Sequence, residues 1–212
     1  MNFHEKENPD KVPRFIYENY INQIASDGVF LELGAFDGTS GSNTLFFEKE
    51  LDFNGVLIEP VVRNFESLVK NRPKCINLNL TVLNECSNQE NIRVKKLGLI
   101  LKELNVKYID FWSLDVKGSE SEVLKSMNWH IPVYLICLNM LDSNCKKINS
   151  NNESSRRILT RNGFRLESLC VNAVGRNEFW TNKEYFRKSK LYNPNKPYKS
   201  NIFSKIKKIF KK

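Results

Sequence analysis

The sequence predicts an α/β fold built on a mostly parallel, seven-stranded sheet with helices on both faces. Short apolar runs that suit strands alternate along the chain with segments of helical spacing. Several of the runs are apolar almost throughout, as strands covered on both faces are. The length of 212 residues is enough for one domain with a sizeable core.

Seven segments have the composition of strands, because they are apolar or alternate and are bounded by glycine, proline or polar residues. GVFLEL and GVLIEP are the first two, CINLNLTVL alternates, and YIDFWSLDV and PVYLICLNM are nearly continuous apolar runs. In chain order the predicted strands are residues 28–33, 55–60, 75–83, 108–116, 132–140, 165–171 and 176–181.

The segments between these strands are predicted to be helices, at residues 11–25, 42–51, 61–71, 96–105, 119–128 and 152–162. Ser42 or Asn43 is expected to cap the second helix. Ser119 and Glu122 have the spacing of a capping box at the start of the fifth. Gly163 is expected just beyond the last helix, where glycine commonly ends a helix.

The net charge of +9 is located in a tail. No acid follows Glu184, whereas one arginine and nine lysines do, so residues 185–212 carry +10 and the remainder about −1. We therefore predict a domain over residues 1–184 and a basic C-terminal tail over residues 185–212. Because the body is not basic, nucleic acid is not expected as a partner.

Within the tail, five apolar residues fall on one side of a helix and lysines fall on the other. The five are Ile202, Phe203, Ile206, Ile209 and Phe210. Basic amphipathic segments bind anionic membrane surfaces, so residues 199–212 are a candidate membrane contact. The alternatives are a disordered lysine-rich end and a helix packed on the domain.

The composition argues against several other classes of protein, namely membrane-spanning, secreted, metal-binding and disulfide-rich ones. No apolar run reaches the length of about 18 residues needed to span a membrane, and the polar N-terminus does not resemble a signal peptide. The five cysteines are widely spaced and form no CxxC pair, so neither a metal site nor a disulfide framework is expected. Reduced thiols predict a cytoplasmic protein, with peripheral membrane contact through the tail as an option.

Polar residues stand at the ends of four predicted strands. In open parallel sheets, ligands bind beyond the carboxyl ends of the strands, near the point where the strand order reverses. The residues placed there are Glu32, Gly34, Asp37 and Gly38 after the first strand, Glu59 after the second, Asp115 after the fourth and Asn139 after the fifth. An acid after the second strand suits a pair of ribose hydroxyls, which predicts a nucleoside ligand.

The loop after the first strand favours one nucleoside over another. A dinucleotide site would read GxGxxG, whereas here Gly34, Gly38 and Gly41 are spaced differently and Glu32 and Asp37 lie among them. Acids repel a pyrophosphate but attract the sulfonium and ammonium of S-adenosylmethionine. The loop therefore favours S-adenosylmethionine over NAD; the alternative is a tight turn that merely requires glycine.

The sequence resembles the FkbM-type family of S-adenosylmethionine-dependent methyltransferases. The resemblance rests on FLELGAFDGTSGSNTLFFEKELDFNGVLIEP, NRPKC, IDFWSLDVKGSESEVLKSMNW, PVYLIC, RRILTRNGF and NEFWTNKEYFRK, which together cover most of the chain. It implies a Rossmann-like methyltransferase fold. It also implies methyl transfer to a hydroxyl, often on a sugar or glycan, so that the expected partner is a sugar or glycan acceptor.

The resemblance also implies roles for individual residues. Asp115 would lie beside the reacting methyl group. The residues expected to hold the cofactor are Glu32, Gly34, Ala35, Asp37, Gly38, Asn43 and Glu59.

Two positions depart from the family pattern. Lys117 stands where DVEG would place a glutamate, and Asn139 stands where a glutamate usually ends the fifth strand. Lys117 is either a replacement base, if burial lowers its pKa, or a solvated lysine at the rim. We therefore name Asp115, Lys117 and Asn139 as catalytic candidates.

The alternative to an active O-methyltransferase is a catalytically degenerate relative that serves as a cofactor-binding or interaction module; an RNA methyltransferase is a third, weaker option.

Overall fold

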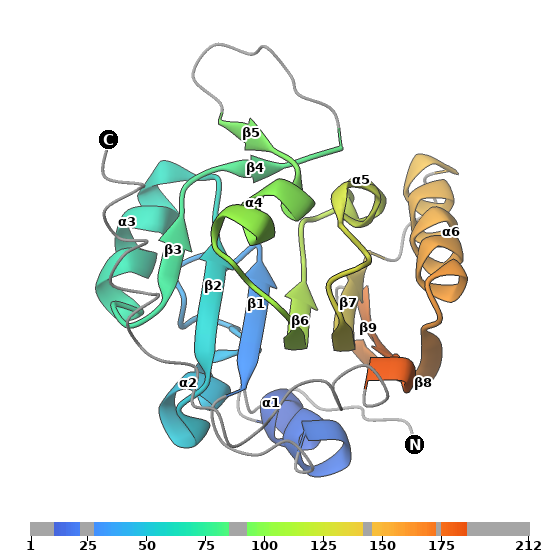
Figure 1. The fold of residues 1–212 in the computed structure, drawn as a ribbon, viewed down its shortest axis with the longest axis horizontal. Coiled ribbons are helices and arrows are strands. Elements are labelled where there is room, and N and C mark those ends of the chain that lie inside the picture. The colour runs from blue at the N-terminus through green and yellow to red at the C-terminus, as the bar shows by residue number, and fades with distance from the viewer. Residues whose placement is uncertain (1–10, 22–27, 85–92, 142–145, 173–174, 186–212) are drawn as a thin grey trace.

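A seven-stranded sheet runs through the computed structural model, which describes residues 11–21, 28–84, 93–141, 146–172 and 175–185 (Figure 1). Its strands are β1 (Val29–Leu33), β2 (Asn54–Ile58), β3 (Ile76–Leu78), β6 (Ile109–Leu114), β7 (Val133–Met140), β8 (Arg165–Asn172) and β9 (Gly175–Thr181). The lateral order is β3-β2-β1-β6-β7-β9-β8. Neighbours are parallel except where β9 pairs with β7 and β8. The predicted mostly parallel sheet is therefore confirmed.

Helices cover both faces of this sheet, as the sequence predicts. They are α1 (Lys11–Ile16), a π-helical turn η1 (Tyr17–Ile21), α2 (Leu45–Leu51), α3 (Val62–Asn71), α4 (Leu97–Glu103), α5 (Glu120–Ser126) and α6 (Lys146–Arg161). Side chains of α4, α5 and α6 pack on the face that includes Leu31 and Leu33, in front of the sheet in Figure 1. Those of α1, η1, α2 and α3 pack on the face that includes Phe30. This division follows from the alternation of side chains along β1.

The strand order reverses between β1 and β6. From β1 the chain proceeds outward to β2 and β3, and then returns to place β6 on the opposite side of β1. The arrowheads of β1, β2 and β6 point to the same side of the molecule in Figure 1. The carboxyl ends of these three strands therefore surround the switch point, where such sheets bind ligands.

The predicted single strand at residues 75–83 is wrong. Only β3 joins the main sheet, and Thr81–Val82 (β4) pairs instead with Val94–Lys95 (β5) in a separate two-stranded sheet. Between them the Asn79 side-chain amide donates to the carbonyls of Glu59 and Pro60, at 2.9 and 3.0 Å. These side-chain hydrogen bonds replace the backbone hydrogen bonds that would continue the pairing of β3 with β2. The chain therefore leaves the sheet at Asn79.

Helix starts also differ from the prediction. The second helix begins at Leu45 after Thr44, and Thr44 makes no side-chain capping bond. The Ser42 hydroxyl and the Asn43 backbone N–H are bound by a carboxylate of β1 instead. Ser119 precedes α5 but likewise makes no capping bond, so the expected capping box with Glu122 does not form.

The first and last helices differ in extent. Helix α1 ends at Ile16 and continues as the π-helical turn η1, and residues 22–25 of the predicted helix lie outside the described residues. Helix α6 begins at Lys146, earlier than predicted. Its predicted end is confirmed: Gly163 has φ +84°, its N–H donates to Thr160, and the Phe164 N–H donates to Leu159. This pair of bonds is the Schellman arrangement.

Most of the predicted tail lies outside the described residues, which end at Tyr185. The amphipathic segment and its membrane contact therefore stay predictions. Within the described part of the chain, no helix is long and apolar enough to cross a membrane.

Tyr185 is fastened to the end of the sheet away from the switch point. Its hydroxyl donates to Asp110 Oδ1 at 2.5 Å, and the Val29 backbone N–H donates to Asp110 Oδ2 at 2.7 Å. Asp110 is buried at the start of β6. Burial raises the pKa of this carboxyl to about 6, although both hydrogen bonds act to lower it.

Asp110 is therefore expected to make stability depend on pH. Unfolded, the carboxyl titrates near its ordinary value of 3.8, whereas folded it holds its proton up to about pH 6. The raised pKa thus favours folding at low pH, and this contribution is lost as pH rises through 6, by on the order of 2–3 kcal/mol. In Asp110→Asn the amide can accept from Val29 and donate to Tyr185 without titrating.

We predict that the unfolding free energy of Asp110→Asn, relative to the wild type, rises between pH 4.5 and 7.5. Urea unfolding at a series of pH values measures it. The exposed Glu66→Gln change on α3 is the control and should show no such rise. A pH-independent difference between Asp110→Asn and the wild type would contradict the assignment.

Candidate functional site

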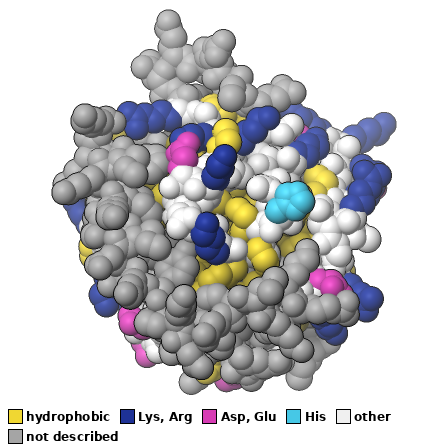
Figure 2. All heavy atoms as spheres, in the orientation of Figure 1, with side chains coloured by type: hydrophobic (Ala, Val, Ile, Leu, Met, Phe, Trp, Pro, Cys, Tyr) yellow, Lys and Arg dark blue, Asp and Glu magenta, His cyan; other side chains and the backbone are white. Residues whose placement is uncertain are grey.

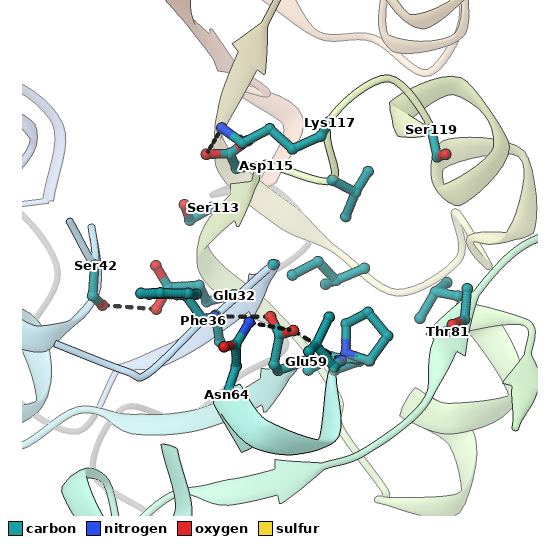
Figure 3. A pocket seen from close by; sticks show the side chains of 18 of the residues that line it. Glu32, Phe36, Ser42, Glu59, Asn64, Thr81, Ser113, Asp115, Lys117 and Ser119 are labelled. Atoms are coloured by element: carbon teal, nitrogen blue, oxygen red, sulfur yellow. Dashed lines mark hydrogen bonds and ion pairs between the residues drawn. The ribbon is translucent and has the colours of Figure 1, made fainter. Parts of the chain in front are cut away.

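A cavity of about 520 Å³ lies at the carboxyl ends of β1, β2 and β6 (Figure 3). The structure brings together seven of the predicted site residues in its wall: Glu32, Gly34, Ala35, Asn43, Glu59, Asp115 and Lys117. Asp37, Gly38 and Asn139 are not among its lining residues. The volume is within the usual range for small-molecule sites, about 300–1,000 Å³.

Gly34 brings the loop after β1 into contact with the end of β6. Its φ is +80°, and a Cβ atom here would lie 1.9 Å from the Asp115 carbonyl oxygen. The Gly34 N–H donates to the Ile58 carbonyl at 3.0 Å. Only glycine can occupy this position without displacing Asp115, so the glycine keeps the three strand ends close around the cavity.

Glu32 is a buried acceptor that fixes the segment before α2. Its Oε2 accepts from the hydroxyls of Ser42 and Thr44, at 2.8 and 2.7 Å, and its Oε1 accepts from the Asn43 N–H at 3.1 Å. Burial raises the pKa of Glu32, while these bonds and the charge of Arg72 act to lower it. The Glu32 carboxyl is therefore bound to the chain's own residues 42–44 and holds this part of the cavity wall in place (Figure 3).

Glu59 joins the loop after β1 to the start of α3. One carboxylate oxygen accepts from the Phe36 N–H at 2.9 Å. The other accepts from the Val61 N–H at 2.9 Å and the Asn64 amide at 3.3 Å. A carboxylate has about four acceptor positions, so Glu59 retains capacity for a hydroxyl in the cavity. Phe36 and Asn64 were not predicted as site residues. Asn64 could have been predicted, because it lies in the first turn of the helix that follows Glu59, close enough for its amide to reach the carboxylate.

Asp37 and Gly38 build the loop rather than line the cavity. The Asp37 carboxylate accepts from the backbone N–H groups of Thr39 and Ser40, at 2.8 and 2.7 Å, and from both hydroxyls. Although burial raises the pKa of Asp37, these bonds lower it to about 2. The Gly38 carbonyl accepts from Arg72 at 2.9 Å. Both residues therefore hold the backbone in its turn.

Asp115 and Lys117 form an ion pair on the β6 side of the cavity. The Lys117 Nζ lies 2.8 Å from Asp115 Oδ1, and the two side chains are 64% and 30% exposed. Figure 3 shows the ammonium and the carboxylate turned toward each other. Asn139 lies elsewhere: its amide donates to Asn177 on β9 at 3.1 Å. The structure thus brings together two of the three catalytic candidates.

Arg72, which the sequence did not predict as a site residue, has a guanidinium that is fully buried under the loop. It contacts Glu48 through a short hydrogen bond and donates to the hydroxyls of Ser42 and Thr44, both at 3.2 Å. Its Nη1 lies 4.0 Å from Glu32. Arg72 falls in the NRPKC segment, but nothing in its local pattern distinguishes it from an exposed helix-end arginine.

The sequence matches no protein-family model and no curated protein sequence. Solved structures do resemble the fold. Methyltransferase FkbM from Methylobacillus flagellatus has a TM-score of 0.55 at 15% identity, over 79% of this chain and 50% of that one. TrmK from M. capricolum, solved with S-adenosyl-homocysteine, has a TM-score of 0.52 at 11% identity, over 98% and 96%. Aeropyrum pernix fibrillarin, solved with S-adenosyl-L-methionine, has 0.50 at 10%, over 74% and 67%.

These likenesses confirm the predicted Rossmann-like methyltransferase fold. The chain spans about half the length of the FkbM protein, and proteins of several methyltransferase types share the fold. The fold therefore does not single out the FkbM family.

The close contact at Gly34 predicts that replacing this glycine by alanine lowers the free energy of unfolding. Gly34→Ala adds both a strained left-handed backbone and a clash with the Asp115 carbonyl. Gly41 in the same loop also has positive φ, +68°, but a Cβ there meets nothing within 4 Å. We expect Gly41→Ala to lose about 1–2 kcal/mol of unfolding free energy and Gly34→Ala to lose about 1–3 kcal/mol more.

Urea unfolding of both variants measures the difference. Equal losses would mean that the loop does not touch β6 at Gly34.

Proposed function

We propose that this cavity binds S-adenosylmethionine and that the protein is an S-adenosylmethionine-dependent methyltransferase. The observation that carries the proposal is the convergence of Glu32, Glu59 and Asp115 from three parallel strand ends on one cavity at the switch point. A surplus of carboxylates there favours a ligand that bears positive charge.

The residues present fit this cofactor. Glu59 is buried and keeps acceptor capacity for a ribose hydroxyl. Pro60, Val61 and Val82 form an apolar part of the wall that suits an adenine ring. Gly34 lets the backbone come close to a ligand. Lys117 opposes a cationic ligand, but its charge is compensated by the carboxylate of Asp115.

When bound, S-adenosylmethionine supplies an electrophilic methyl group on a sulfonium. The chain's own contribution is then to orient the acceptor oxygen and to take its proton. Asp115 is placed for both, because its carboxylate is partly exposed at the end of a buried central strand. The Asp115 carboxylate would take up the proton that the acceptor hydroxyl releases on methylation.

We propose further that the acceptor is the hydroxyl of a sugar or glycan. The support for this step is the sequence resemblance to the FkbM-type family, in segments that include the cavity-lining loops after β1 and β6. The cavity is open enough beside Asp115 and Lys117 for an acceptor, since both side chains are partly exposed.

A second candidate function is a cofactor-binding module without catalysis. The ion pair between Lys117 and Asp115 favours it, because the ammonium occupies the carboxylate that would otherwise bind the acceptor hydroxyl. The two functions share the cofactor and differ in turnover.

Cofactor binding tests the proposed site. Glu59→Ala removes a charged acceptor and is expected to weaken S-adenosylmethionine binding by about 1–3 kcal/mol. Isothermal titration calorimetry measures this, with circular dichroism to confirm folding. Glu66→Ala removes an equal charge from the exposed side of α3 and is the control. No binding to the wild type, or the same affinity in both variants, would overturn the proposal.

Turnover tests the role of Asp115. We expect Asp115→Asn to lower the rate of methyl transfer at least about 100-fold, the lower end for loss of a general base. Labelled S-adenosylmethionine and a panel of sugars and glycans provide the assay. Glu122→Gln is the control, because it disrupts a similar carboxylate–lysine pair with Lys125, 2.6 Å apart, on α5 outside the cavity.

An unchanged rate in Asp115→Asn would assign proton removal to another group. Cofactor binding without methylation of any acceptor in the panel would support the second candidate function.

A further inference from the structure

Two residues of the cavity have a backbone conformation that their side chains disfavour. Four described residues other than glycine have φ near +50°: Phe36, Asp52, Asn105 and Lys117. Aspartate and asparagine adopt this conformation readily, whereas phenylalanine and lysine do so rarely. Phe36 and Lys117 are also the two of the four that line the cavity. Such strain persists where surrounding structure fixes it and is common at ligand sites.

A buried carboxylate fixes the turn at Lys117. The next residue, Gly118, has φ +102°, and its N–H donates to both oxygens of Glu120, at 3.0 and 3.1 Å. Glu120 is 1% exposed and also accepts from the Asn151 amide of α6 at 2.9 Å. The turn that carries Lys117 is therefore tied through Glu120 to α6, which fixes the backbone from which the lysine side chain extends.

Lys117 supplies the one cationic side chain among the described residues that line the cavity. Its ammonium contacts Asp115 but is 64% exposed, and an ammonium has three N–H donors. The pair with Asp115 therefore leaves N–H donors that are exposed for a second acceptor. Figure 2 shows further lysine and arginine side chains along the upper part of the described surface, the side to which the strand ends point in Figure 1.

We propose that Lys117 selects an acceptor that carries a negative charge. The inference rests on the proposed function and names its substrate class: an acidic sugar, with a carboxylate or a phosphate group bound by the Lys117 ammonium and a hydroxyl presented to Asp115. An anionic acceptor compensates the charge of Lys117 while Asp115 engages the hydroxyl. This accounts for a lysine that extends from a fixed turn beside the carboxylate, in a cavity proposed for a cationic cofactor.

Ligand binding to the full chain tests the proposal without turnover. With S-adenosylhomocysteine saturating, binding of methyl glucoside, glucuronate and glucose 6-phosphate is measured by saturation-transfer NMR titration. We expect at least one anionic sugar to bind about tenfold or more tightly than the neutral one, the scale of a charge-assisted hydrogen bond. The comparison of glucuronate with glucose 6-phosphate distinguishes a carboxylate from a phosphate.

Three variants assign the preference to Lys117. Lys117→Met should reduce it to within about twofold, because the charged bond is lost, whereas Lys117→Arg should keep it. Lys125→Met removes an ammonium that is likewise paired with a carboxylate, at 2.6 Å from Glu122, but lies outside the cavity. It should leave the preference unchanged.

Two kinds of failure are distinguishable. If S-adenosylhomocysteine does not bind the wild type, the proposed function fails. If it binds but no anionic sugar is preferred, or the preference survives in Lys117→Met, the inference about Lys117 is overturned while the cofactor site stands.

Discussion

The candidate site depends on the pairing of the buried Arg72 guanidinium with the carboxylates and carbonyl around it. The guanidinium stands at the end of α3 with no exposed surface, packs 5.5 Å from the centre of the Phe30 ring, and contacts Glu48 and the Gly38 carbonyl. A buried charge is tolerated only when it is paired, and loss of one partner costs about 3–5 kcal/mol. Because Glu32 lies 4.0 Å away and holds the segment before α2, this network fixes the loop that forms the cavity wall.

The rest of the site is built outward from that loop. Gly34 places the loop against the end of β6, and Glu59 ties it to the start of α3. The carboxylates that favour a cationic ligand are therefore also structural acceptors. A substitution at Glu59 changes both the charge and the support of Phe36, which is why binding has to be compared with folding in every variant. Asp115 is less constrained, because the one side chain that binds its carboxylate among the described residues is Lys117, which also lines the cavity.

Sequence alone predicted the sheet and much of the cavity because buried parallel strands leave a local signal. The apolar runs around Leu31, Phe111 and Leu135 mark the central strands, and the acids after them lie where strand ends meet. Local pattern does not reveal partners far along the chain. The division of the predicted strand at Asn79 depends on carbonyls near residue 59, and Asn139 was assigned by analogy although its partner is on β9.

The cavity between Gly34, Glu59 and Asp115 is the site proposed to hold S-adenosylmethionine. A crystal structure of the protein grown with S-adenosylhomocysteine tests it most directly. We expect the ligand in this cavity, with its ribose hydroxyls toward Glu59 and its sulfur on the side of Asp115. A ligand bound at another place, or an empty cavity at saturating ligand in a crystal where this face is accessible, would contradict it.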